Sequence, residues 1–147
     1  MKITGSYTLA SVELERAYNA LQDPLVLTKC IPGCESLDKV ADAEYAMKMK
    51  MALAAVSGQF TGKVKLVDPS PPVAFKMIVE GHGKIGFLKG EGLLSLKPSA
   101  DNGVEVAYDG DVQVGGTMAA IGQRLIDTTS KMMIKRFFDK LNGELNP

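Results

Sequence analysis

The C-terminal segment from Gly116 to Pro147 most constrains the fold, because it predicts one long amphipathic helix. Thr117 is suited to cap the start of the helix and Gly143 to end it, so about 25 residues lie between two end signals. At about 1.5 Å per residue, such a helix is roughly 37 Å long and crosses a small domain. A helix of this length with one apolar face needs an apolar surface to lie on. Its predicted apolar face carries Met118, Ile121, Gly122, Leu125, Ile126, Met132 and Met133.

The middle of the chain predicts such a surface, because apolar and polar residues alternate there with the period of a β-strand. The clearest run is 45–53, where tyrosine, methionine and leucine alternate with Lys48, Lys50 and alanines. Two glycines, Gly90 and Gly92, interrupt one later run and predict a bulge or a strong bend. We expect about seven antiparallel strands. The alternating runs are residues 2–9, 45–53, 59–66, 73–79, 87–97 and 104–114, within a strand-rich region that starts at Glu35.

Two short helices are expected between the first strand and the rest of the sheet. Ser11 is a candidate N-cap for the first, and Asp23 followed by Pro24 predicts the start of the second. Strands followed by a closing helix predict an α+β fold in which a curved antiparallel sheet wraps around the long C-terminal helix. With 46% hydrophobic residues, we expect residues 1–147 to form a single domain with a continuous core. A sheet bent around a helix can enclose a cavity.

Charge and composition argue against several classes of function. Seventeen basic and seventeen acidic residues balance, without the basic cluster typical of proteins that bind nucleic acid. The sequence shows neither a signal peptide nor an apolar run long enough to span a bilayer, so a cytoplasmic location is expected. Cys30 and Cys34 are expected to be small buried residues rather than a disulfide. With His82 as the single histidine, we expect no metal site.

Two motifs resemble a known family. They are CIPGCESL at Cys30–Leu37 and VGGTMAAIGQRLID at Val114–Asp127, and both are similar to the CoxG family of carbon monoxide dehydrogenase subunits. That family lies within the polyketide cyclase and lipid-transport superfamily, which includes START-like and birch-pollen-allergen-like helix-grip proteins. The resemblance implies a helix-grip fold with an apolar cavity and no catalytic residue.

The resemblance also implies an accessory role beside molybdenum-containing hydroxylases of the carbon monoxide or xanthine dehydrogenase type. Members of the family are thought to link the enzyme to the membrane or to its quinone acceptor, and some carry a hydrophobic C-terminal extension. This sequence stops at Pro147 without such a tail. Contact with the inner face of the membrane therefore stays open, without an anchor in this chain.

The inward positions of the predicted strands and helix are almost all apolar, which argues against an enzyme. Seven are methionines, whose unbranched side chains re-pack around irregular shapes. Ordinary core packing would explain them, and so would a cavity for a quinone or lipid that binds without a covalent link. The candidate ligand-binding residues are Tyr7, Tyr45, Met47, Met49, Met51, Phe75, Met77, Tyr108, Ile121, Leu125, Met132 and Met133.

Two surface features complete the expectations. Residues near the strand connection at Gly81–Gly83, together with Gly115 and Gly116 after the last predicted strand, suggest either a solvated rim or a polar gate to the cavity. On the helical wheel, Ile134 and Phe138 point away from the Ile121 side, which predicts a small exposed patch for a partner or for a second copy in a homodimer. The protein is thus expected to carry a ligand for a dehydrogenase or, alternatively, to recruit it during assembly. The candidate rim residues are His82, Lys84, Phe87, Gly115 and Gly116.

Overall fold

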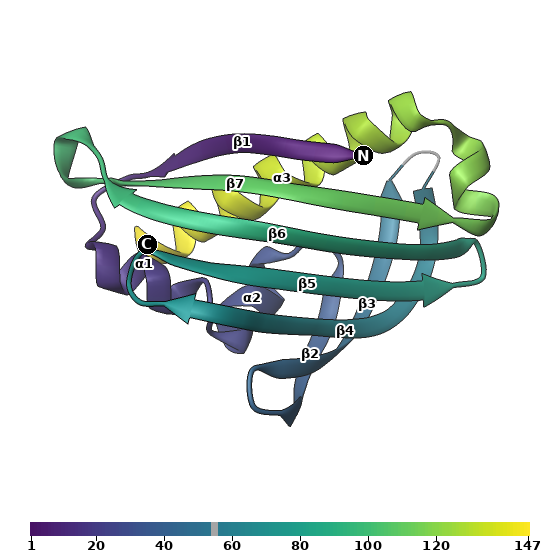
Figure 1. Ribbon diagram of the computed structural model, residues 1–147, viewed down its shortest axis with the longest axis horizontal. Helices are drawn as coiled ribbons and strands as arrows, with labels where there is room; N and C mark the ends of the chain where they lie inside the picture. Colours follow the sequence, from purple (N-terminus) through teal and green to yellow (C-terminus); the bar gives the residue numbers. More distant parts are fainter. Residues whose placement is uncertain (54–55) are drawn as a thin grey trace.

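The computed structural model describes residues 1–53 and 56–147, which form a seven-stranded antiparallel sheet with a long C-terminal helix across one face (Figure 1). Two short helices follow the first strand, as the sequence predicts. The elements are β1 Lys2–Leu9, α1 Leu14–Ala20, α2 Pro24–Cys30, β2 Cys34–Ala41, β3 Glu44–Leu53, β4 Val56–Ser70, β5 Ala74–Gly83, β6 Gly86–Pro98, the 3-10 turn η1 Ala100–Asn102, β7 Val104–Gly115, the 3-10 segment η2 Gly116–Ile121 and α3 Gln123–Leu145.

The strand order explains how the two halves of the chain meet. Strands β2 to β7 pair with their neighbours in sequence, whereas β1 pairs with β7 and places Tyr7 opposite Val106. The β1 strand therefore lies at one edge of the sheet, beside the last strand and near α3 (Figure 1). This arrangement confirms the predicted α+β fold with a curved antiparallel sheet and a closing helix.

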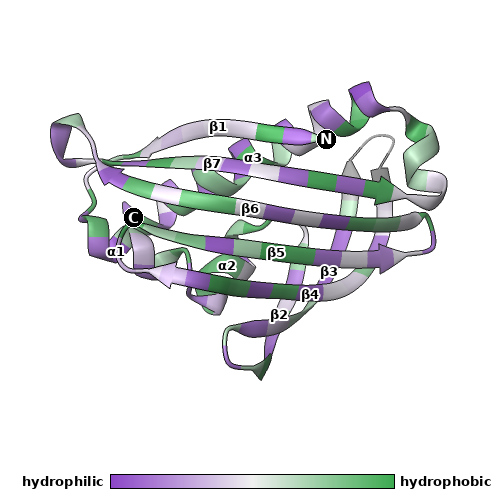
Figure 2. Ribbon diagram, viewed as in Figure 1, coloured by the Kyte–Doolittle hydropathy of each residue, from purple (hydrophilic) through white to green (hydrophobic). Residues whose placement is uncertain are grey.

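The alternating pattern positions the core as predicted. On β3, Tyr45, Met47, Met49 and Met51 are buried, while Lys48 is exposed. Figure 2 shows the same alternation of hydrophilic and hydrophobic residues along the neighbouring strands. Because successive side chains of a strand point to opposite faces, one face of the sheet is apolar and turns toward the helices.

The short helices match the prediction in part. The Asp23 carboxylate accepts a hydrogen bond from the Leu25 backbone N–H at 2.9 Å, and Pro24 is the first residue of α2, as expected. Ser11, by contrast, is not an N-cap. Its φ is 45°, and α1 begins only at Leu14, after Glu13, whose side chain makes no capping hydrogen bond.

The closing helix differs from the prediction at its start, because Gly122 adopts a φ of 104°, which favours glycine and interrupts the helix. The preceding residues form η2, and α3 runs without a break through Gly143. The interruption shifts the angular phase between the two segments. Leu125, expected to face inward, is therefore 49% exposed, and Phe138, expected on an exposed patch, is only 3% exposed. The predicted docking patch at Ile134 and Phe138 is wrong, since both pack against the core.

The two glycines in β6 produce no bulge, which was one of the two predicted alternatives. Gly90 pairs with Val79 on β5 and Val112 on β7, and Gly92 pairs with Met77 and Gly110. The register is continuous on both sides through these positions. The glycines therefore have another explanation, which depends on what they face.

Candidate functional site

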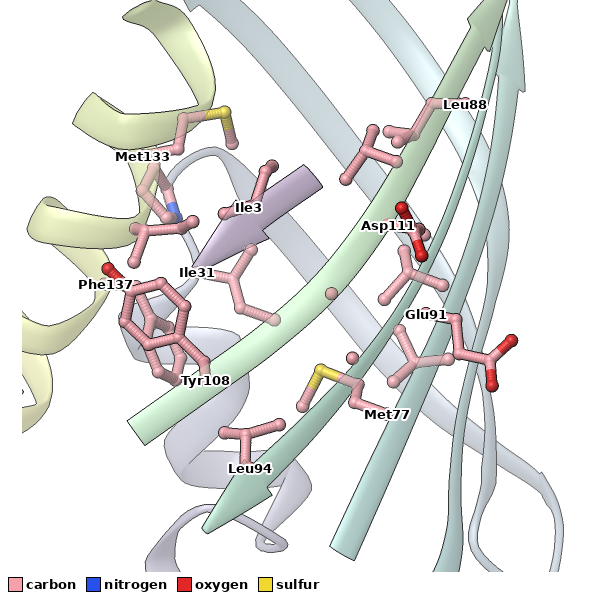
Figure 3. A pocket seen from close by; sticks show the side chains of 18 of the residues that line it. Ile3, Ile31, Met77, Leu88, Glu91, Leu94, Tyr108, Asp111, Met133 and Phe137 are labelled. Carbon is pink, nitrogen blue, oxygen red and sulfur yellow. The ribbon is translucent and has the colours of Figure 1, made fainter. Parts of the chain in front are cut away.

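A cavity of about 320 Å³ lies between the inner face of the sheet and α3. Its walls come from β1 and β3 to β7, from α3, and from the loop after α2 through Ile31 and Pro32. Met133 and Phe137 of α3 face the sheet residues Leu88 and Met77 across it (Figure 3). The cavity thus lies at the place where the closing helix covers the curved sheet.

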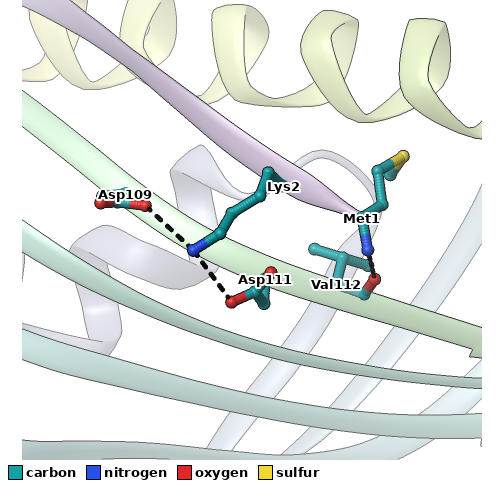
Figure 4. Close-up of polar contacts among 5 residues, drawn as sticks. All are labelled: Met1, Lys2, Asp109, Asp111 and Val112. Carbon is teal, nitrogen blue, oxygen red and sulfur yellow. Dashed lines mark hydrogen bonds and ion pairs between the residues drawn. The ribbon is translucent and has the colours of Figure 1, made fainter.

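The wall of the cavity is almost entirely apolar. Glu91, Asp109 and Asp111 are among the lining residues, but they alternate with inward residues, so their side chains leave the sheet on the outer face. There, the Lys2 ammonium lies 3.3 Å from the Asp111 carboxylate and 4.0 Å from that of Asp109 (Figure 4). Because a buried charge without a partner is costly, this wall suits hydrocarbon and disfavours an ionised group placed against it.

The N-terminal backbone is hydrogen-bonded to β7 beside this wall. The amino group of Met1 donates a hydrogen bond of 2.9 Å to the Val112 carbonyl (Figure 4). The Val112 N–H in turn donates to the Met1 carbonyl at 2.9 Å. These two bonds hold β1 against β7 next to Ile3, which lines the cavity.

Three aromatic rings stack at one end of the cavity. Phe138 lies between Tyr7 and Tyr108, with centroid distances of 5.2 and 5.8 Å and interplanar angles of 15° and 18°. Gly5 makes room for Tyr108, since a Cβ on Gly5 would lie 2.5 Å from the Tyr108 hydroxyl oxygen. Phe138 and Tyr108 both line the cavity, whereas Tyr7 does not.

A hydrogen-bonded group at the surface joins Tyr7 of this stack to α3. The Tyr7 hydroxyl donates to one oxygen of Asp139 at 2.8 Å, and the Lys135 ammonium donates to the other at 2.6 Å. Burial, followed by the hydrogen bond to Asp139 and its charge, raises the pKa of Tyr7 to about 12. The hydrogen bonds from Lys135 and then Tyr7 hold the pKa of Asp139 below its usual value. The group therefore connects β1 to α3 across the whole sequence.

These shifts predict how the connection responds to pH. The pKa of Asp139 is lower in the folded protein, so its contribution to stability is lost as the pH falls through that lowered value. The pKa of Tyr7 is higher in the folded protein, so its contribution is present below pH 10 and is lost as the pH rises toward about 12.

Tyr7→Phe tests this connection. The variant keeps the ring stack but loses one hydrogen bond, so we expect the Asp139 pKa to rise toward its usual value. Because Lys135 is the larger cause, the pKa should stay partly lowered. Carboxyl-carbon NMR titration of Asp139 in both proteins measures the change, and an identical pKa would show that the bond to Tyr7 does not form in solution.

The cavity includes five of the residues proposed from the sequence, namely Met47, Met49, Met77, Tyr108 and Met133. The other proposed residues lie elsewhere. Leu125 is exposed on the outer side of α3, while Phe75 is buried in the core against Tyr18, at 5.7 Å between ring centroids. The seven proposed residues outside the cavity lining are Tyr7, Tyr45, Met51, Phe75, Ile121, Leu125 and Met132.

The proposed rim is also not part of this cavity. Phe87 faces the outside of the sheet, where its ring covers Gly115, and it lines a separate cavity together with Val112 and Ile126. Gly116 is required by its φ of 72° and by its close approach to Gly86. The rim residues absent from the main lining are His82, Lys84, Phe87, Gly115 and Gly116.

Several lining residues escape the sequence patterns. Phe138 is assigned to an exposed patch when the helical wheel is drawn through Gly122, and Phe137 is not proposed for the cavity. Ile31 and Pro32 come from the loop after α2, which no periodic pattern describes. The signal that could have been used is glycine at inward strand positions, where Gly90, Gly92 and Gly110 leave space. The other lining residues missed are Ile3, Val64, Val79, Leu88, Glu91, Leu94, Asp109, Asp111, Val112 and Ile134.

Other reactive groups are isolated within the described part of the chain. No three His, Cys, Asp or Glu side chains in residues 1–53 and 56–147 come together as a metal site. Cys30 and Cys34 are free, and burial is the main cause that raises the pKa of the Cys30 thiol to about 11. A thiol with a raised pKa is a poor nucleophile at neutral pH. Of the described helices, none combines the length and apolarity needed to cross a membrane.

Solved structures similar to this chain confirm the fold. A conserved protein from Geobacillus kaustophilus is 34% identical, with a TM-score of 0.95 over 99% of this chain and 95% of that chain. A START superfamily protein from Mycobacterium smegmatis is 11% identical, with a TM-score of 0.78 over 99% and 97%. Ara h 8.0201 is 13% identical, with a TM-score of 0.71 over 99% and 97%. The fold is thus the START-like, birch-pollen-allergen-like helix grip.

Comparison at the level of families is more specific than the fold. A search of curated proteins finds no match. The family model for the CoxG subunit of carbon monoxide dehydrogenase matches residues 10–146, which include both motifs singled out in the sequence. Because this match covers almost the whole chain, the protein belongs to the CoxG family of carbon monoxide dehydrogenase subunits.

Proposed function

We propose that this protein is a non-catalytic carrier that binds an uncharged apolar molecule between the sheet and α3. The observation that carries the proposal is the cavity of about 320 Å³ with an almost wholly apolar wall. Ligand pockets in proteins span about 300 to 1,000 Å³, so this volume is at the lower end of that range. An apolar cavity left empty costs stability, whereas filling it with hydrocarbon adds about 0.8 kcal/mol for each CH₂ buried.

The ligand we propose is a quinone or a neutral lipid, and the partner is a molybdenum-containing dehydrogenase of the carbon monoxide or xanthine type. Membership of the CoxG family supports the partner, because the family takes its name from carbon monoxide dehydrogenase. The apolar wall supports the ligand, since it offers an isoprenoid or alkyl chain many contacts and no charge. In this role the protein brings the apolar molecule to the enzyme and leaves the chemistry to the enzyme.

Ligand binding can be measured directly. We expect the purified protein to release an apolar molecule into organic solvent, detectable by mass spectrometry. After removal of that molecule, titration with a menaquinone should change the intrinsic fluorescence saturably, because the chain has four tyrosines and no tryptophan and Tyr108 lines the cavity. Palmitate should bind more weakly, since its carboxylate finds no partner in the wall. The absence of saturable binding by any long-chain apolar compound would contradict the proposal.

A second experiment separates a carrier from an assembly factor. We expect quinone-loaded protein to accelerate quinone reduction by the purified, already assembled dehydrogenase, and ligand-free protein to do so much less. If both forms act equally, or act only while the dehydrogenase is being assembled, the protein recruits or assembles the enzyme and its cavity is only a loosely packed core.

A further inference from the structure

Gly90 and Gly92 are glycines that neither the backbone nor the packing requires. Neither has a positive φ, and the strand register runs through both without a shift. A Cβ on Gly92 or on Gly90 would come no closer than 3.7 Å to any heavy atom. This distance is an ordinary van der Waals contact. At Gly62, in contrast, a Cβ would lie 1.7 Å from the Glu80 carbonyl oxygen, so there the fold itself demands glycine.

Glycine at these two positions lowers the stability of the folded protein, and no interaction among the described residues of the sheet offsets this loss. Glycine inside a strand is less favourable than alanine by about 0.5–1 kcal/mol, because it loses more backbone freedom on folding. Alanine would fit at both positions. Both glycines line the cavity, and the absence of their side chains leaves more space in it.

The space that they leave has the shape of a pit. Gly92 lies opposite Gly110 on β7, and this glycine pair is flanked by Met77 on β5 and Ile3 on β1. The pit is therefore two strands wide, with neighbouring strands about 4.8 Å apart, and Gly90 extends it along β6. The next inward pair, Leu94 and Tyr108, closes one end.

Side chains from β6, β7 and α3 form the other sides of the pit. Leu88 is the next inward residue of β6 beyond Gly90, and Val112 lies opposite Gly90 on β7. Met133 and Phe137 of α3 lie across from the sheet (Figure 3). A pit that side chains surround in the plane of the sheet holds a compact, wide group. A straight alkyl chain needs a continuous groove instead, and it gains little from a local widening.

We infer that Gly90 and Gly92 are specificity-determining residues that admit an uncharged ligand with a ring and select it over one made of a single straight chain. The inference rests on the proposed function and narrows its ligand class. The ring lies against the glycine backbone of β6 and β7 beneath α3. Any apolar tail then occupies the remainder of the cavity, between the methionines Met47 and Met49 and the helix.

Gly92→Ala and Gly90→Ala test the inference, with Gly81→Ala as the matched control. Gly81 also faces inward in a strand and has 3.9 Å of free distance for a Cβ, but it does not line the cavity. The probes are a naphthoquinone with a short isoprenoid tail and 1-hexadecanol, which is uncharged and unbranched. Native mass spectrometry of a mixture of the two gives the ratio of bound quinone to bound alcohol.

We expect each cavity variant to lower this ratio at least about fivefold, the effect of one over-packed methyl group, while Gly81→Ala leaves it unchanged. The melting temperature should stay equal or rise in all three, because alanine fits the strand. An unchanged ratio in Gly92→Ala and Gly90→Ala would overturn the inference and leave the carrier proposal intact. Unfolding of these variants would overturn it too, by showing that the fold requires the glycines. If the wild-type protein binds neither probe, the carrier proposal itself fails.

Discussion

Phe138→Ala should lower the free energy of unfolding by about 3–5 kcal/mol, the usual cost of removing a buried phenylalanine ring. Phe138 is 3% exposed and lies between the rings of Tyr7 and Tyr108, so its removal leaves a gap at the end of the cavity. Neither tyrosine can close this gap easily, because each is held in its own strand. Urea denaturation followed by circular dichroism measures the loss.

Phe87→Ala provides the matched control for this measurement. It makes the same substitution at a ring that is 44% exposed on the outer face of the sheet, so the loss should be clearly smaller. If Phe138→Ala cost no more than Phe87→Ala, Phe138 would be at the surface, and the arrangement of α3 described above would be wrong.

Met133→Lys should abolish binding of apolar ligands. Met133 projects from α3 into the cavity, where a lysine ammonium meets an almost entirely apolar surface, because the carboxylates of the lining strands leave the sheet on the outer face. Burying such a charge costs several kcal/mol, so the ammonium draws water into the space that the ligand occupies. A loss of this size corresponds to at least about a hundredfold weaker binding. Titration with a menaquinone followed by tyrosine fluorescence measures the affinity.

The neighbouring residue Met132 provides the matched control. Met132 is also half-buried on α3, but it does not line the cavity, so Met132→Lys should keep the wild-type affinity within a few fold. Equal losses in the two variants would mean that the lysine acts through the helix as a whole. Equal and unchanged binding would place the ligand outside this cavity.

Much of the sheet was predictable, because strand alternation is a local property of the sequence. Met47 and Met49 point inward for the same reason that Lys48 points outward, and no distant residue is needed to decide this. The start of α2 was equally local, since Asp23 caps the helix through its own neighbour Leu25. These predictions depend on a few consecutive residues only.

The angular phase of the closing helix was not predictable in the same way. One dihedral angle at Gly122 separates η2 from α3, and an ideal wheel drawn through it assigns Leu125 to the inside and Phe138 to the outside. The sequence offers Gly115, Gly116 and Gly122 as possible breaks. Only tertiary packing decides which of them interrupts the helix, so the wheel misplaced Leu125 and Phe138, although it correctly placed Met118, Ile126 and Met133 on the inside.

The composition of the cavity required information from several elements at once. Tyr45 and Met51 lie on the inward face of β3 together with Met47 and Met49, yet only the last two line the cavity. The difference depends on where α2 and α3 cover the sheet, which no strand pattern contains. Sequence patterns identify the inward face, whereas the fold decides which part of that face is filled by core and which part stays open.

The pairing of β1 with β7 has a consequence for how the binding site comes into being. Tyr7 and Asp139, whose hydrogen bond joins β1 to α3, are 132 positions apart, and Ile3, which lines the cavity, is similarly remote from α3 in the sequence. Contacts between such distant residues form slowly, because a long loop must close first. During synthesis the successive hairpins from β2 to β7 can pair as they emerge, but their methionine face stays uncovered until α3 has left the ribosome. The site is therefore assembled last, and an incomplete chain has no cavity in which to hold a ligand.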